Sequence, residues 1–222
     1  MNDVMKIGAG RMRPRSTALG MLGMAALVFL VATSVNCFGT SQQPVYYALE
    51  GTGEVAPRAV KWPHSLVVTR FTVRAPYDRP ELVYRKAGRE LRFYPFDLWA
   101  GKPGRMMAEA VTEHLRSAGI FRDVTMSTVA GEADFELRGE VVTIEELDVA
   151  EKDWRAHLEM RFELVSVATS EVVMRHKFDT NRPVVDHKVS AVARVLDEIL
   201  GAELANLTTA IDAQLARTAS GQ

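Results

Sequence analysis

The stretch WRAHLEMRFELV, residues 154–165, alternates apolar and polar side chains along its whole length. Such period-two alternation predicts one long β-strand with one buried face and one solvated face. Antiparallel sheets commonly leave one face in water, whereas parallel sheets are covered on both faces. The sequence therefore predicts an antiparallel sheet built around this strand. The residues expected to face the core are Trp154, Ala156, Leu158, Met160, Phe162 and Leu164.

Partner strands are expected on both sides of this stretch. ADFELRGEVVTIEEL (133–147) precedes it across the charged turn DVAEKD, and EVVMRHKF (171–178) follows it across the tight turn ATS. Gly139 lies within the first of these strands, where a glycine often marks a bulge. Both segments are predicted to pair antiparallel with the central strand.

Upstream of these strands, β-rich segments alternate with loop signals. VYYAL (45–49) is a brief strand candidate, and residues 50–64 contain two glycines and two prolines typical of a loop. SLVVTRFTV (65–73) is predicted to be a strand. ELVYRK (81–86) and ELRFYPF (90–96) are predicted to form a hairpin around the turn KAGR.

Two segments carry helical periodicity. KPGRMMAEAVTEHLRSAGIF (102–121) places apolar residues at helical spacing, with Pro103 near its start and Gly119 after its end, as is usual at helix boundaries. HKVSAVARVLDEILGAELANLTTAIDAQLA (187–216) keeps an apolar stripe over many turns and predicts a long helix. Two helices packed on one face of an antiparallel sheet form a two-layer sandwich of the α+β class.

The N-terminus has the composition of an export signal. Four basic residues precede residues 16–35, which carry no charge. A cleaved signal, a retained membrane anchor and a buried core helix are the three interpretations; a core helix is the least favoured, because the run is apolar all round and follows a basic cluster. Removing residues 1–36 leaves 23 basic and 27 acidic side chains, a net charge of −4. The chain has no excess of basic residues that would suggest nucleic acid as a partner.

The single cysteine of the 222 residues, Cys37, lies directly after this apolar run. The segment resembles a bacterial lipoprotein signal, in which such a cysteine is acylated and becomes the first residue. We favour this interpretation over an idle thiol at the end of a retained helix. Residues 1–36 would then be the signal, 37–44 a tether and 45–217 the domain. Phe38, where aspartate would signal retention, fits delivery to the outer membrane.

Catalytic and metal-binding patterns are weak. The five histidines are scattered, with no metal-binding spacing, no Gly-rich phosphate loop and no nucleophile motif. EELDVAEKD (145–153) is rich in carboxylates, but a charged turn is most simply a solvated turn. The sequence therefore predicts neither an enzyme nor a bound cofactor or metal.

The stretch RFYPFDLWAGKPGRMM (92–107) crowds aromatic side chains at a junction between strand and helix. Because aromatic side chains bury large areas, the favoured interpretation is a core plug that fixes the first helix. The alternative is an amphipathic surface for a lipid or a partner protein, with Tyr94, Phe96 and Trp99 as the contact residues.

The order of these pieces resembles the ABC-type transport auxiliary lipoprotein family. The similarity covers about residues 45–215 and comprises VYYAL, the hairpin ending in FY, the tryptophan before a proline-started helix, LRGEVVTIEELD, RFELVSVATSEVVMRHKF and the terminal helix. Tyr77, Tyr84, Tyr94 and Trp99 match patterned positions of the family. This family includes the lipoprotein partner of the paraquat-inducible membrane system.

The resemblance implies non-enzymatic work beside an ABC ATPase, a permease and MCE-domain proteins, which move phospholipid or other apolar molecules across the periplasm. The domain would be lipid-anchored on the periplasmic side of the envelope, and could be a homo-oligomer. Two other classes stay open: an accessory lipoprotein of another outer-membrane assembly, favoured by a sheet edge able to extend a partner's strands, and a periplasmic hydrolase, which needs convergent His and carboxylate groups in a deep pocket.

Overall fold

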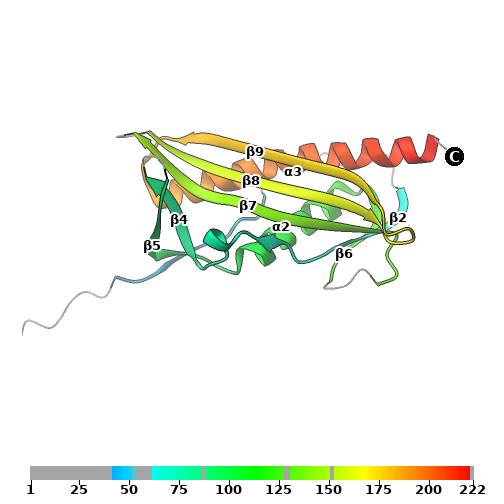
Figure 1. The fold of residues 1–222 in the computed structure, drawn as a ribbon, viewed down its shortest axis with the longest axis horizontal. Coiled ribbons are helices and arrows are strands. Elements are labelled where there is room, and N and C mark those ends of the chain that lie inside the picture. The colour runs from blue at the N-terminus through cyan, green and yellow to red at the C-terminus, as the bar shows by residue number, and fades with distance from the viewer. Residues whose placement is uncertain are drawn as a thin grey trace, which may run out of the picture. The chain divides into compact units, whose positions relative to one another are not determined.

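The structure is a computed structural model and describes residues 42–51, 53, 62–86, 89–127, 131–150 and 153–220. The chain divides into two units, Met1–Gln42 and Gln43–Gln222, and the second holds nearly all of the described residues. Its helices lie behind the central strands in Figure 1. The elements are β1 (Val45–Tyr47), β2 (Trp62–Val68), β3 (Thr72–Val73), the 3₁₀ turn η1 (Ala75–Tyr77), β4 (Glu81–Lys86), β5 (Glu90–Trp99), α2 (Pro103–Ala118), β6 (Phe121–Met126), β7 (Phe135–Ala150), β8 (Asp153–Ser166), β9 (Val172–Val184) and α3 (Val189–Ser220).

The predicted α+β fold is confirmed: two helices pack on a sheet that comprises all the described strands. β8 is the long alternating strand, and its predicted apolar face is buried from Ala156 to Leu164. It pairs antiparallel with β7 on one side and with β9 on the other. The sequence thus predicted β7, β8 and β9 and their antiparallel pairing.

The sheet is mixed, however, and not antiparallel throughout. The other edge of β7 pairs in parallel with β2, β3 and β4 in succession. β2 also pairs in parallel with β6, a strand that the sequence analysis missed, and β1 pairs in parallel with the end of β5. The expectation failed here because each parallel partner reaches β7 through a long connection, which local alternation does not record.

The segment predicted as one strand over 65–73 is divided into two. β2 begins earlier, at Trp62, whose indole N–H donates a 2.8 Å hydrogen bond to Oδ1 of Asp212 on α3. The chain then leaves the sheet at Phe71, which is buried, and rejoins it at β3. A Cβ atom on Gly139 would lie 2.6 Å from the Phe71 ring. Gly139 therefore does not mark a bulge but leaves room for this ring. The irregularities of β7 lie between Val141 and Thr143 and between Asp148 and Ala150.

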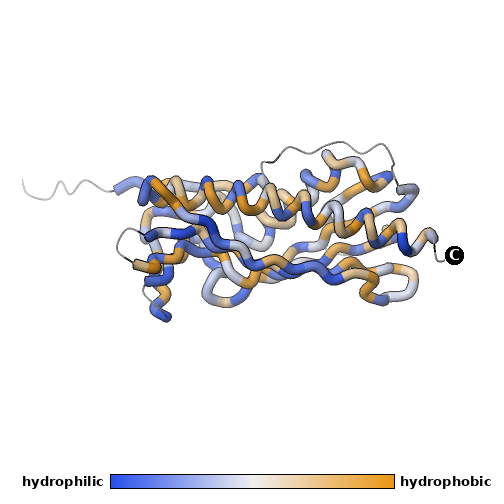
Figure 2. Tube along the Cα trace, turned by 90° about the horizontal axis from the view of Figure 1, so that it is seen from above, coloured by the Kyte–Doolittle hydropathy of each residue, from blue (hydrophilic) through white to orange (hydrophobic). Residues whose placement is uncertain are grey.

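The helices cover the sheet with the faces that the sequence predicted. α2 buries Met107, Val111 and Leu115, and it ends at Gly119, whose φ of 66° gives the left-handed cap that glycine favours. α3 runs for 32 residues, and hydrophobic residues recur along its length in Figure 2. Its buried stripe includes Val192, Leu196, Ile199, Leu204, Leu207, Ile211 and Leu215. The core thus lies between the helices and one face of the sheet.

Candidate functional site

Trp99, the last residue of β5, belongs to the core. Its side chain is only 3% exposed, and its backbone N–H donates to the carbonyl of Pro80 at 2.7 Å. The next backbone N–H, of Ala100, donates to the carbonyl of Tyr47 at the same distance. Trp99 therefore stands where three chain segments meet, as the core-plug interpretation requires.

Tyr94 also points inward, toward a buried carboxyl group. Its hydroxyl donates a 2.8 Å hydrogen bond to Oε2 of Glu146, and its ring packs against Tyr84 with centroids 4.6 Å apart. Burial raises the pKa of Glu146 to about 7, and the bond from Tyr94 only partly opposes that effect. Tyr94 is thus a supporting residue for a carboxyl group that changes protonation near neutral pH.

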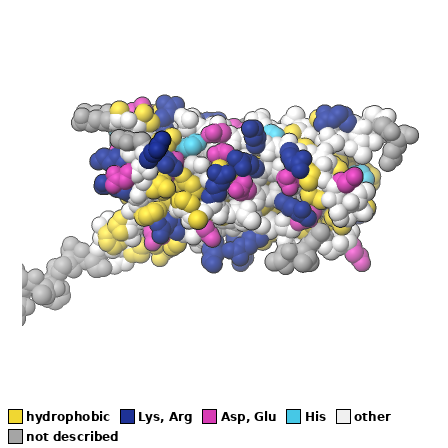
Figure 3. All heavy atoms as spheres, viewed as in Figure 1, with side chains coloured by type: hydrophobic (Ala, Val, Ile, Leu, Met, Phe, Trp, Pro, Cys, Tyr) yellow, Lys and Arg dark blue, Asp and Glu magenta, His cyan; other side chains and the backbone are white. Residues whose placement is uncertain are grey.

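Phe96 lies at the surface instead, within a group of exposed apolar side chains that we call the edge patch: Val45, Tyr46, Phe93 and Phe96. Tyr46 is 62% exposed and Phe96 is 37% exposed. The pairing of β1 with β5 sets Val45 beside Asp97 and Tyr46 beside Leu98, and so places β1 next to Phe96. The molecular surface in Figure 3 shows hydrophobic side chains gathered at its lower left, where β4 and β5 lie in Figure 1.

Phe93 in the edge patch carries a cation on its ring. The guanidinium carbon of Arg79 lies 3.5 Å from the ring centroid, within the range of a cation–π interaction. Arg79 also forms an ion pair with Glu81 at 3.3 Å, so the edge patch combines aromatic area with a paired charge. The sequence predicted Phe96 as a contact residue but not Tyr46 or Phe93, because strand alternation does not indicate which end of the sheet remains uncovered.

A second cluster, which we call the Glu145 network, lies among β4, β7 and β8. Both carboxylate oxygens of Glu145 accept a hydrogen bond from Arg85, at 2.9 Å each, and Oε2 also accepts one from the Tyr77 hydroxyl at 2.6 Å. His157 Nδ1 lies 3.4 Å from Oε1 of the same carboxylate, and its Nε2 lies 2.8 Å from Oδ1 of Asp179. The network joins three strands and the η1 turn through a single buried carboxylate.

In the Glu145 network, hydrogen bonds outweigh the effect of burial on the pKa values of Glu145 and His157. Burial would raise the pKa of Glu145, but the bonds from His157, Arg85 and Tyr77 outweigh it and hold the pKa below its usual value. Burial would lower the pKa of His157, but its bonds to Glu145 and Asp179 outweigh this and raise it. Burial, followed by the bond to Glu145, raises the pKa of Tyr77 to about 12. At neutral pH the carboxylate is ionised and Tyr77 is neutral.

Glu145 and Glu146 correct the interpretation of EELDVAEKD as a solvated turn. Both residues lie inside β7 and are 2% exposed. Both residues lie within the strand predicted over 133–147, which the structure extends to Ala150, and partners on the neighbouring hairpin and strands bind the two carboxyl groups. The sequence signal that could have located them is the pair of complementary groups, Arg85 and Tyr94, on the preceding hairpin.

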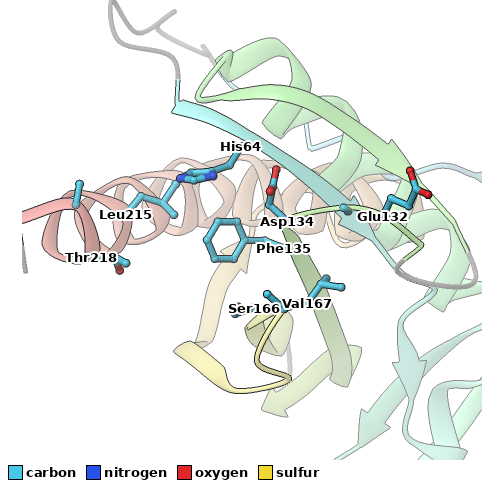
Figure 4. Close-up of a pocket in the computed structure, with 11 residues that line it drawn as sticks. His64, Glu132, Asp134, Phe135, Ser166, Val167, Leu215 and Thr218 are labelled. Atoms are coloured by element: carbon cyan, nitrogen blue, oxygen red, sulfur yellow. The ribbon is translucent and has the colours of Figure 1, made fainter. Parts of the chain in front are cut away.

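The pocket in Figure 4 is an open hollow of about 570 Å³ at the end of α3. One of its two carboxylates, Asp134, accepts hydrogen bonds from the backbone N–H and the hydroxyl of Ser65, and the backbone bond lowers its pKa. Its histidine, His64, packs edge-on against Phe135 with ring centroids 5.3 Å apart. These groups fasten β2 to the start of β7, which is a structural task.

The other histidines also lie in packed surroundings and not in a metal site. Within the part of the chain that the structure describes, no three His, Cys, Asp or Glu side chains are placed to hold a metal ion. His114 is buried on α2, and burial lowers its pKa. His176 packs beside Phe162 on the inner side of β9, and burial lowers its pKa as well.

The predicted acylation site, Cys37, lies outside the described residues, as do the predicted signal and most of the tether. Among the helices that the structure does describe, none combines the length and the hydrophobicity needed to cross a bilayer.

Comparisons with known proteins agree with this architecture. The crystal structure of protein XCC0632 from Xanthomonas campestris is similar with a TM-score of 0.69 and 22% identity, over 78% of this chain and 99% of that chain. A second crystal structure, of an uncharacterized protein, has a TM-score of 0.59 and 14% identity, over 77% of this chain and 99% of that one. At these identities the likeness concerns the fold alone. Among curated proteins, none matches this chain.

The sequence itself matches a protein family across most of its length. Residues 47–211 match the family described as the ABC-type transport auxiliary lipoprotein component. The matched range begins in β1 and ends in α3, so it includes Phe93 and Phe96 of the edge patch, the Glu145 network, α2 and most of α3, whereas Val45 and Tyr46 lie just before it. The chain therefore belongs to the ABC-type transport auxiliary lipoprotein family.

Proposed function

We propose that this protein is a non-enzymatic adaptor of an MCE-linked ABC transport system that moves phospholipid or another apolar solute across the cell envelope. The observation that carries the proposal is the family match over residues 47–211, which covers nearly the whole folded domain. An ATPase and a permease would supply the energy and the membrane passage. This chain would dock on an MCE-domain protein that bridges the periplasm.

The anchor of this adaptor is a lipid on Cys37. The cysteine follows the apolar N-terminal run directly and precedes β1 by a short polar segment. Two or three acyl chains on one residue hold a soluble domain at a membrane durably, because each buried methylene contributes about 0.8 kcal/mol. Anchoring on the periplasmic face of the outer membrane confines the domain to a surface and raises its effective concentration for a partner.

The structural clusters fit an adaptor better than a catalyst. The Glu145 network satisfies its carboxylate with three side chains, Arg85, Tyr77 and His157, and Asp134 is occupied by Ser65, so neither carboxylate is poised to act on a substrate. The described residues instead offer surfaces: the edge patch, and the charged outer side of β7 to β9 seen in Figure 3.

The alternative, an accessory lipoprotein of another outer-membrane assembly that lends a strand edge to its partner, has less support. Within the described residues, β5 has no strand beside residues 90–96 on the side away from β4. That edge contains Pro95, which lacks a backbone N–H, and its pairing with β4 is irregular between Glu81 and Val83. Prolines and bulges are features that block strand addition.

The test is native purification of the full chain from its own membranes with a C-terminal tag. We expect the ATPase, the permease and an MCE-domain protein to co-purify, and the intact mass to correspond to residues 37–222 plus acyl chains. Cys37→Ser should release a folded domain from the membrane and weaken the co-purification. Recovery of an outer-membrane barrel without any ABC component would overturn the proposal.

A further inference from the structure

We propose that the edge patch is a bilayer-contacting surface, by which the anchored domain rests on the lipid headgroups beside its own acyl chains. This inference rests on the proposed acylation of Cys37 and adds a second, protein-borne contact with the same membrane. It assigns Tyr46, Phe93 and Phe96 as the contact residues and a phospholipid surface as the occupant.

The chain between the lipid anchor on Cys37 and the first strand of the domain is short. Eight peptide steps separate Cys37 from Val45, the first residue of β1. At about 3.3–3.6 Å per step, a fully extended tether reaches no farther than roughly 29 Å. β1 is therefore the described strand that stays nearest to the lipid anchor along the chain, and it carries the most exposed aromatic side chain of the edge patch, Tyr46 at 62%.

β1 pairs with β5, the strand that carries the other aromatic residues of the edge patch. Because β1 lies parallel to the end of β5, a membrane that meets Tyr46 also meets the strand that carries Phe96 and Phe93. These aromatic side chains are 37% and 40% exposed, so each is partly accessible at the surface and partly packed in the sheet. One short tether therefore brings several apolar groups to the bilayer together.

The chemistry of the patch fits a lipid headgroup region. Tyrosine joins an apolar ring to a polar tip and is enriched at the membrane–water interface. Arg79 stacks on Phe93 and forms an ion pair with Glu81 at 3.3 Å, so its stem covers apolar surface while its charge is paired within the protein.

The main competing occupant is a protein strand or a second copy added to the β5 edge. Pro95 removes one of the N–H groups such a strand would need, and the irregular β4–β5 pairing distorts the ladder beside it. The exposed area, moreover, is made of side chains and not of a flat row of backbone groups. A fluid lipid surface tolerates this irregular geometry, whereas strand addition does not.

The experiment places an environment-sensitive fluorophore on single cysteines of the full acylated chain. Because acylation occupies Cys37, the introduced residue in Tyr46→Cys or Phe96→Cys is the only thiol available. Met126→Cys is the matched control: Met126 is 40% exposed on β6, at the other end of the strand order. The proteins are reconstituted on vesicles of phosphatidylethanolamine with phosphatidylglycerol.

We expect a blue shift and quenching by bromine-labelled lipid at positions 46 and 96, and the signal of the vesicle-free protein at position 126. Intact mass and flotation report separately on the anchor. Protein that is acylated and floats, yet gives the same signal at all three positions, overturns the patch and leaves the anchor standing. Protein without acyl mass overturns the anchor, and the patch proposal with it.

A surface variant separates lipid from protein as the occupant. Tyr46→Ser combined with Phe96→Ser should leave the protein folded with only a modest drop in melting temperature, since both side chains are partly exposed, while the shed fraction of the acylated protein rises several-fold in repeated vesicle washes. Unchanged retention on vesicles, together with lost co-purification of the transport proteins, would identify the patch as a protein-docking surface and overturn the proposal.

Discussion

The hydroxyl of Tyr77 donates a 2.6 Å hydrogen bond to the carboxylate of Glu145, and the two groups share Arg85 as a common partner. The carboxylate is 1% exposed and Arg85 only partly exposed, so the ion pair is shielded from solvent on one side. Tyr77 comes from η1 and Glu145 from β7, so the bond closes the turn down onto the sheet.

Removing Arg85 should therefore destabilise the domain strongly. Arg85→Ala leaves the buried Glu145 charge without its two-pronged partner, and a loss of about 3–5 kcal/mol in the free energy of unfolding is expected. Urea denaturation measures it. Arg161→Ala is the control, because the Arg161–Glu140 pair lies in solvent and should contribute no more than about 1 kcal/mol. Equal losses in the two variants would contradict the importance of the buried pair.

Glu146 should make stability depend on pH. Its folded pKa of about 7 lies above its usual value of 4.5, so its contribution is fully present below pH 4.5 and is lost as pH rises toward 7. The difference corresponds to roughly 3 kcal/mol. His157, whose pKa is also raised, loses its contribution only above pH 6.5, and Glu145, whose pKa is lowered, loses its own only below 4.5.

The measurement is the free energy of unfolding at several pH values between 4.5 and 7. Glu146→Gln keeps an acceptor for the Tyr94 hydroxyl and should flatten the decline across this window, while Glu140→Gln, on the exposed side, should leave the slope as it is. A variant slope identical to that of the parent would show that Glu146 titrates normally.

Trp99 and Phe96 test the two interpretations of the aromatic junction against each other. Trp99→Ala empties a core position that is 3% exposed and should lower the free energy of unfolding by about 3–5 kcal/mol. Phe96→Ala removes a ring that is 37% exposed and should cost less, about 1–2 kcal/mol. Thermal and urea melts of both variants provide the comparison; a small loss for Trp99→Ala would argue against its role as a core plug.

Gly139 should resist even a methyl group. In Gly139→Ala the new Cβ would lie 2.6 Å from the ring of Phe71, which must shift, and overpacking of this kind destabilises by about 1–3 kcal/mol. Gly101→Ala is the control, since no atom lies within 4 Å of the added Cβ there. Adding Phe71→Leu to Gly139→Ala should give a loss smaller than the sum of the two single losses. Additive losses would mean that the ring does not fill the space over Gly139.

The sequence predicted the elements that local periodicity specifies. The alternation from Trp154 to Leu164 identified β8 and its buried face, and the apolar stripes identified α2 and α3. The family resemblance placed the chain in the family that its residues 47–211 match. These features depend on neighbours in the chain, which a sequence displays directly.

What the sequence did not predict depends on residues distant in the chain. Phe71 leaves β2 because Gly139, on another strand, makes room for it. Glu145 and Glu146 are buried because Arg85 and Tyr94 on the hairpin meet them. Beyond the irregularity at Val141, the alternation of β7 changes phase: Ile144 and Glu146 pair with Leu158 and Ala156 on the buried face of β8, where period-two counting from Val141 would place Thr143 and Glu145.

The place of β7 at the middle of the sheet has a consequence for how the protein is made. β2, β3 and β4 each find their parallel partner in β7, which ends at Ala150, although they occupy residues 62–86. A chain that crosses a membrane from its N-terminus delivers those three strands long before their template arrives. Until then the strand edges that pair with β7 stay without their partner, although β2 can pair with β6 and β4 with β5. This domain is therefore expected to need a holding chaperone during export more than a protein of hairpins does.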